Sequence, residues 1–415
     1  MKKILYIYVI LFFASFSPSS YGELELDPET IEGCSNEVKL PPATTQADPS
    51  AKKILPPVQG IYPGIYNIGS TLPKYNVFKS EVGQAPVIVH TFHDFIAPKD
   101  LFSKTPKIRT FEQALEGDGA PSPLDLANEL NKDGSVLAIS WAIECCDMES
   151  MSLWYGLSKG NNVVPGILKG DFDTDIRKAA KQIKAFGHPI MLGLFGEYGP
   201  QSWFLFGKDG KTAINYSKNI CNEYGNPSWP DGPERVRDTY RHIIDLFRQE
   251  GVNNVTWFMY TSTGYMNQDD EDFTTWLHPK YFYPGDSYID WVGQSAYFID
   301  PENRPDVNEE VGDISKAILQ GYNAWGSVTQ RPFFIPELGA AGDGSNSRAE
   351  IIRKVVTEYL PNLSRVKAFS FANAELFDVY FDIPILGKKY PDELLMWKSS
   401  VINNSSKFQH SLIVK

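Results

Sequence analysis

The chain has 415 residues, of which 42% are hydrophobic and 22% are charged, a balance typical of a globular protein with a sizeable core. Its formal net charge of −12 argues against nucleic acid or an anionic membrane as a partner, because binding phosphate groups requires a basic surface. The charge is compatible with a neutral substrate.

The N-terminal segment, residues 1–22, is predicted to be a secretory signal peptide. Lys2 and Lys3 give it a basic start, and the apolar run that follows is too short to span a membrane. We therefore expect a secreted protein, extracellular or periplasmic, that has no membrane contact once the signal is removed. Residues 23–57 are polar and rich in proline, and we expect them to form a leader outside the folded domain.

Four cysteines, Cys34, Cys145, Cys146 and Cys221, could form disulfides in an exported protein. Three full pairings exist. Cys145 and Cys146 are not expected to pair with each other, because the peptide between them would be strained. The sequence leaves the pairing of the four open. No CxxC motif or histidine cluster accompanies them, so neither a metal site nor a cofactor is predicted.

Residues 58–400 are predicted to form one (β/α)8 TIM barrel with long βα loops, followed by a C-terminal tail at 401–415. Apolar runs alternate there with helix-like segments, which predicts βα units around a parallel sheet, and eight units predict a closed barrel. An open doubly wound sheet is the alternative, but no G-x-G-x-x-G motif follows the first run. The strands are predicted at 60–69, 86–92, 135–141, 189–196, 254–260, 288–297, 332–337 and 366–371, and the helices at 123–131, 173–186, 234–249, 311–324 and 348–360.

The helix predicted over 234–249 has the clearest pattern. Tyr240, Ile243 and Phe247 recur at spacings of three and four residues, which places them on one face. Gly251 is a typical residue at which such a helix ends. We therefore expect the apolar face of this helix to cover the barrel.

Two glutamates follow buried strands in the same local pattern. Glu197 comes directly after the fourth run, close in sequence to Trp203 and Phe206, and Glu337 ends the seventh run. Because the carboxyl ends of barrel strands meet at one mouth, both carboxylates are expected to face the same site. Paired carboxylates across a mouth are what glycoside hydrolysis requires, and burial near aromatic rings helps Glu197 to hold a proton. The alternatives are a loop glutamate that caps the next element and a Glu337 that pairs with a loop arginine.

Several motifs extend this pattern over most of the chain. The segment YPGDSYIDWVG, which leads to Tyr297, is the most specific, and it is joined by LFGEYGPQSWFLFG, by Arg241 with GVNNVTW, and by RPFFIPELG. Through these motifs the chain from about residue 60 to 397 resembles glycoside hydrolase family 26, best known for β-mannanases. The resemblance implies a retaining β-glycosidase in which Glu197 is the acid/base and Glu337 is the nucleophile.

The sequence departs from the family pattern at three places. Gly196 stands where the family has a histidine before the acid/base. Gly193 or Leu194 stands in place of an arginine on the same strand, and Phe371 replaces a tryptophan near the end of the eighth strand. These departures weaken the assignment to mannan in particular, whereas the mechanism with two carboxylates is left intact.

Further strand-end residues are candidates for substrate contacts. His93 follows the second strand and either binds sugar or is a loop histidine with its own partners, and Trp141 either stacks on sugar or packs the barrel. Tyr297 ends the sixth strand, where its phenol can hydrogen-bond the nucleophile and favour the ionised carboxylate. The predicted substrate-binding residues are His93, Trp141, Trp203, Phe206, Tyr297 and Phe371.

The sequence thus predicts a monomeric enzyme that acts on a β-mannan or β-glucan type of polysaccharide or oligosaccharide. The same enzyme class acting on β-1,3-xylan or an exopolysaccharide is one alternative. The other is a non-catalytic carbohydrate-binding protein on the same barrel, against which the presence of both carboxylates argues.

Overall fold

The computed structural model contains a closed barrel of eight parallel strands. It describes residues 51–66, 71–96, 107–114, 121–142, 163–196, 224–226, 231–261, 278–299, 314–341, 350, 352–372, 375–376, 379–380 and 391–415. The last barrel strand, β10, pairs with both its predecessor β9 and the first strand β2, which closes the ring. The barrel strands are β2 (Tyr62–Tyr66), β3 (Ile88–Asp94), β4 (Val136–Ala142), β5 (Ile190–Leu194), β6 (Val255–Thr261), β7 (Trp291–Gln294) continued by β8 (Ala296–Ile299), β9 (Phe333–Ala341) and β10 (Val366–Ala372).

All eight predicted strands are therefore present, and the predicted (β/α)8 barrel is confirmed. The open doubly wound alternative is wrong, because a doubly wound sheet would have two free edges. Parallel barrel strands place their carboxyl ends at one mouth, so the ends of β5 and β9 open on the same side of the molecule.

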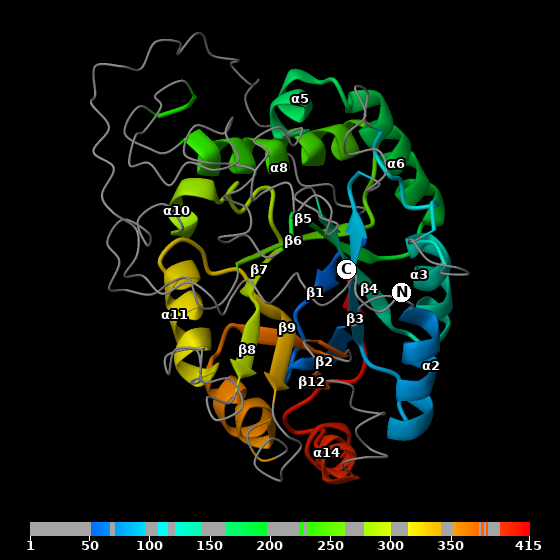
Figure 1. Ribbon diagram of the computed structural model, residues 1–415, viewed down its shortest axis with the longest axis vertical. Coiled ribbons are helices and arrows are strands. Elements are labelled where there is room, and N and C mark those ends of the chain that lie inside the picture. Colours follow the sequence, from blue (N-terminus) through cyan, green and yellow to red (C-terminus); the bar gives the residue numbers. More distant parts are fainter. Residues whose placement is uncertain are drawn as a thin grey trace.

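Helices surround the strands, as Figure 1 shows. The predicted helices at 123–131, 173–186, 234–249 and 311–324 are confirmed, and the segment predicted at 348–360 ends in a wide π-helical turn followed by a tight 3₁₀ turn. The helix at 71–82 was not predicted. The helical elements are α2 (Thr71–Val82), α3 (Pro123–Lys132), α5 (Val163–Lys169), α6 (Asp173–Phe186), α8 (Asp231–Gln249), α10 (Pro279–Phe282), α11 (Ile314–Gly326), the turns Val355–Tyr359 and Leu360–Asn362, α14 (Pro391–Met396) and the turn Trp397–Ile402.

Helix α8 shows why the apolar spacing is informative. Tyr240, Ile243 and Phe247 are all buried, so the predicted face does cover the barrel. Helix α6 beside it ends at Gly187, whose φ of 73° lies in the left-handed region that glycine adopts without strain. None of the helices in the described part of the chain is long and apolar enough to cross a membrane.

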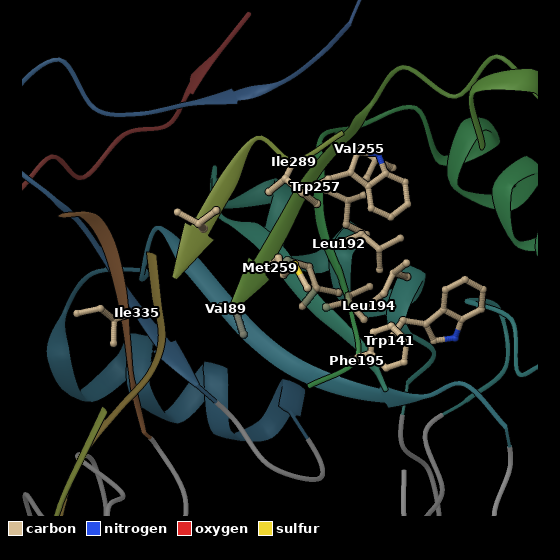
Figure 2. Packing of buried hydrophobic residues seen from close by; sticks show 14 of the residues in the cluster. Val89, Trp141, Leu192, Leu194, Phe195, Val255, Trp257, Met259, Ile289 and Ile335 are labelled. Atoms are coloured by element: carbon tan, nitrogen blue, oxygen red, sulfur yellow. The ribbon is translucent and has the colours of Figure 1, made fainter. Parts of the chain in front are cut away.

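Two apolar layers follow from the alternation of side chains along the strands. One fills the inside of the barrel, with Met191, Phe258 and Phe334 at its centre, so the barrel is a packed core and not a pore. The other lies between the barrel and the helices. Figure 2 shows Leu192 and Met259 among the buried side chains of this outer layer.

The opposite end of the barrel from the mouth is closed by two short strands, β1 (Ile54–Leu55) and β13 (Ile413–Val414), which pair antiparallel. Tyr62 inside the barrel donates a hydrogen bond to the Leu55 carbonyl (3.1 Å) and accepts one from the Ile413 amide (3.0 Å). Lys53 forms an ion pair with Asp290 at 2.6 Å. Residues before the first barrel strand and residues after the last one thus complete the floor of the barrel. The two remaining strands, β11 (Glu375–Leu376) and β12 (Val379–Tyr380), pair with each other.

Candidate active site

Glu337 lies in β9 near the mouth and is only 4% exposed. Its carboxylate accepts a hydrogen bond on each oxygen, from the hydroxyl of Tyr260 to Oε1 (2.8 Å) and from the hydroxyl of Tyr297 to Oε2 (2.7 Å). The predicted contact between Tyr297 and Glu337 is therefore confirmed. Two donors arriving from different strands fix the orientation of the carboxylate, as a nucleophile requires.

An extra residue in β9 turns Glu337 into the barrel. Between Phe334 and Leu338, β9 carries one residue more than the β7–β8 strand beside it, and β10 on the other side shows the same shift of register. Regular alternation from the inward-facing Phe334 would point residue 337 outward toward the helices. The bulge reverses this, so that Glu337 faces Tyr260 and Tyr297.

A chain of polar side chains continues from Glu337 across the inside of the barrel. The Tyr260 hydroxyl lies 3.2 Å from Ser140 Oγ, and Ser140 Oγ lies 2.8 Å from Nε2 of His90. Burial lowers the pKa of His90 to about 3, with the backbone of Pro336 acting in the opposite direction, so the imidazole is neutral at pH 7. The sequence analysis did not single out these three residues.

At the end of β5, the backbone turns sharply just before the second predicted carboxylate. Phe195 has φ of 59°, a left-handed conformation that costs a bulky residue of order 1–3 kcal/mol. Its amide donates to the Trp141 carbonyl (3.2 Å), and the Tyr240 hydroxyl bonds both the amide and the carbonyl of Leu194. Contacts on both sides thus hold the turn that leads to Glu197.

Three of the predicted residues, Glu197, Trp203 and Phe206, lie outside the described residues, as do all four cysteines. The separation of the two carboxylates therefore stays a prediction, and so does the pairing of the cysteines.

Two other predicted substrate-binding residues, Trp141 and Phe371, are core residues in this structure. Trp141 is fully buried between Phe95 and Phe111, with ring centroids 4.6 and 4.7 Å away. Phe371 is 1% exposed and packs on Trp397. All of these rings lie in the layer between barrel and helices. For Trp141 these contacts favour packing of the barrel over stacking on sugar. A sugar contact of Trp141 or Phe371 stays a prediction.

His93 is also buried and faces away from the barrel interior. Its Nε2 lies 3.1 Å from the Thr110 carbonyl, and its ring packs on Phe111. Burial, with the nearby Arg109 guanidinium, lowers the pKa of His93 to about 3. The alternative of a histidine with its own internal partners is thus favoured, and sugar binding by His93 stays a prediction. Next to it, Asp94 forms an ion pair with Arg109 at 3.1 Å.

We expect replacement of Trp141 by alanine to act on stability and not selectively on the substrate. Removing a fully buried tryptophan leaves a cavity and typically costs about 3–5 kcal/mol of unfolding free energy. Denaturant unfolding measures this loss, and Trp141→Phe should recover most of it. A Trp141→Phe variant of unchanged stability whose KM rises more than tenfold would instead place Trp141 in the substrate site.

Among the residues that the structure describes, no group of three or more His, Cys, Asp or Glu side chains is arranged to hold a metal ion.

Comparison with known proteins gives the same family as the motifs. Residues 157–340 match the model of Glycosyl hydrolase family 26. Over 220 residues the chain is 24% identical to Endoglucanase H of Acetivibrio thermocellus, a match that covers 53% of this chain but only 20% of that protein.

Solved structures similar to this chain include the YdhT protein of Bacillus subtilis, which is 16% identical with a TM-score of 0.48 over 83% of this chain and 87% of that one. A family 26 β-mannanase from Bacteroides ovatus is 16% identical with a TM-score of 0.46 over 85% and 90% of the two chains. The family model thus matches 184 of the 415 residues, a part of the chain that spans β5 to β9 of the closed barrel, and this part is similar to Glycosyl hydrolase family 26, the family that the motifs resemble.

Proposed function

We propose that this protein is an exported, retaining β-glycoside hydrolase that cleaves a β-linked polysaccharide of the glucan or mannan type. The observation that carries the proposal is the buried carboxylate of Glu337 at the barrel mouth, held by the hydroxyls of Tyr260 and Tyr297. Hydroxyl donors favour the ionised form of a carboxylate, which is the form that can attack an anomeric carbon.

The proposed reaction is a double displacement. Glu337 attacks the anomeric carbon while Glu197 donates its proton to the glycosidic oxygen of the leaving sugar, which gives a covalent glycosyl–enzyme. Glu197, now ionised, then removes a proton from water, and the water oxygen displaces Glu337 and restores both residues. The product keeps the configuration of the substrate because inversion occurs twice.

A non-catalytic carbohydrate-binding protein is the rival from another class. Burying a carboxylate away from water costs free energy. A protein that only binds sugar gains nothing from a buried carboxylate that would offset this cost. The present chain instead buries Glu337 and supplies it with two donors. The free-energy cost of burying the carboxylate has a function if the carboxylate reacts, so the burial favours the enzyme over the non-catalytic binding protein.

The substrate is expected to differ from plain β-1,4-mannan. Gly196 offers no imidazole beside the acid/base, and Gly193 offers no room for the family's arginine, since a Cβ there would lie 2.9 Å from the Phe258 ring. A site built around hydrogen bonds loses much of its activity when the paired polar groups are missing. The similarity to a protein named Endoglucanase H supports keeping β-glucans beside mannans as candidates.

We therefore expect low activity on unbranched β-1,4-mannan and higher activity on another β-glycan. The panel includes mixed-linkage β-glucan, β-1,3-xylan and bacterial exopolysaccharides, with release of reducing ends as the measurement. Glu337→Ala protein is the control for contaminating enzymes. Highest specific activity on plain mannan would show that the two departures have no effect, and binding without release on every glycan would favour the non-catalytic rival.

Export is proposed from the basic start and apolar run of residues 1–22. Mass spectrometry of the N-terminus of protein recovered from the periplasm or the medium tests it. Retention of the full-length chain in the cytoplasm would contradict it.

A further inference from the structure

We propose that Tyr260 is a positioning residue for Glu337, and that Ser140 and His90 hold the Tyr260 hydroxyl in its donating orientation from inside the barrel. The inference rests on the proposed function of Glu337 as nucleophile. The three residues come from β6, β4 and β3, and their polar atoms form a continuous chain that ends on the carboxylate.

The direction of the hydrogen bonds follows from the acceptor at the end of the chain. An ionised carboxylate only accepts, so the Tyr260 hydroxyl must donate its proton to Oε1 of Glu337. With its proton on Glu337, the Tyr260 hydroxyl is the acceptor in its contact with the Ser140 hydroxyl, and Ser140 in turn accepts from His90. In this direction of the chain, the ring proton of His90 is on Nε2.

The state of His90 agrees with this direction. The imidazole is fully buried, and burial keeps it neutral at pH 7 with one ring proton to donate. Two rings hold it in place, Tyr66 of the neighbouring β2 at 5.1 Å and Phe92 of its own strand at 5.4 Å between centroids. The donor at the far end of the chain is thus immobilised by packing, so it orients Ser140 at little entropic cost.

Aligned hydrogen bonds strengthen one another in a low-dielectric interior. Tyr260 should therefore be a better donor to Glu337 than an isolated phenol. Loss of the Ser140 hydroxyl should weaken the hydrogen bond from Tyr260 to Glu337. The titratable groups that face Glu337 in the described part of the structure include Tyr260 of β6 and Tyr297 of β8, with His90 of β3 behind Tyr260.

Direct titration of the Glu337 carboxyl tests the proposal without any substrate. Protein labelled with carboxyl-¹³C glutamate is titrated by NMR, and the Glu337 signal is assigned by its loss in Glu337→Gln. We expect Tyr260→Phe to raise the midpoint by about one to two pH units, because a hydrogen bond to a charged group is lost. Ser140→Ala should raise the midpoint by a smaller amount.

The matched control is Tyr62→Phe. Tyr62 is an equally buried tyrosine at the floor of the barrel, and its hydroxyl bonds only backbone groups of Leu55 and Ile413 among the contacts described. Its loss should lower the melting temperature and leave the Glu337 midpoint unchanged. A general loosening of the barrel would move the midpoint in both tyrosine variants, and that result would overturn the proposal.

The pH profile of kcat/KM gives a second measurement. Because Glu337 must be ionised to attack, a higher midpoint moves the acid limb of the profile to higher pH in Tyr260→Phe. An unchanged midpoint in folded Tyr260→Phe overturns the positioning role. If Tyr260→Phe does not fold, an unchanged Glu337 midpoint in Ser140→Ala overturns the proposed hydrogen-bond chain. Retained activity in Glu337→Ala would refute the proposed nucleophile and leave the titration result standing, so the two failures are distinguishable.

Discussion

Glu337→Ala is expected to lower turnover by several orders of magnitude while the barrel stays folded. The change removes the only group proposed to form the glycosyl–enzyme, and with it the covalent route. The measurement is initial rate on the best glycan of the panel, with circular dichroism and thermal melting as checks on the fold. A variant that keeps more than about a tenth of wild-type turnover would exclude the role, because a tenfold loss is only ~1.4 kcal/mol of barrier.

The alanine variant also leaves the hydroxyls of Tyr260 and Tyr297 without this acceptor. A buried donor without its partner costs about 1–3 kcal/mol, so some loss of stability is expected. Glu337→Gln is the better matched control, since its amide oxygen can still accept one of the two hydrogen bonds. Loss of activity in both variants, with a smaller loss of stability in the glutamine variant, separates the chemical role from the structural one.

The wild-type enzyme should release a first product of retained anomeric configuration. Retaining glycosidases hold their carboxyl groups about 5–5.5 Å apart, whereas inverting ones leave about 6.5–9.5 Å for a water. We expect Glu197 and Glu337 to be of the closer class. NMR of the first-formed product decides the point, and an inverted product would refute the double displacement.

Glu197→Ala is expected to have an effect that depends on the leaving group. The leaving group of a polysaccharide is a sugar hydroxyl, which needs a proton as the bond breaks. Hydrolysis of polysaccharide should therefore fall by about a hundredfold or more, in line with general acid catalysis. Activated aryl glycosides leave as stable phenolates and barely need protonation, so their first step should lose little. Rates on dinitrophenyl and unactivated substrates are compared in the same variant.

Equal losses on both classes of substrate would remove Glu197 from the acid role. The neighbouring Tyr198 offers a control one residue away in the sequence, since Tyr198→Phe changes a side chain there without removing a carboxyl group. Rates of that variant should fall on both classes alike or not at all.

The sequence predicted those features that depend on local patterns. Eight apolar runs separated by helix-like segments are enough to predict a barrel, because each run needs both faces covered and the βα connection allows only a parallel neighbour. The face of α8 that carries Tyr240 and Phe247 was predicted for the same reason. The presence of Glu337 on the seventh predicted strand also follows from the sequence alone, although β9 continues past the predicted end to Ala341.

The direction in which a strand-end residue points was decided only by the tertiary structure. Trp141 and Phe371 end their predicted apolar runs as Glu337 does, yet they face the helices and not the mouth. A side chain alternates with a period of two along a strand, so its direction depends on the register of the whole strand. In β9 the bulge around Pro336 reverses the alternation, and a proline inside a predicted strand was the one local sign of it.

Tyr260, Ser140 and His90 could not be predicted as a group. Each sits inside a run that reads as a buried strand, where a polar residue is unremarkable until its partner is known. Their contact depends on the closure of the ring, which brings β3, β4 and β6 around the carboxylate of β9. The sequence by itself therefore determined the barrel and the strand that carries Glu337, because these rest on local periodicity. The partners that orient Glu337 were decided by the tertiary structure, because hydrogen bonds between residues 77 positions apart depend on strand order and register.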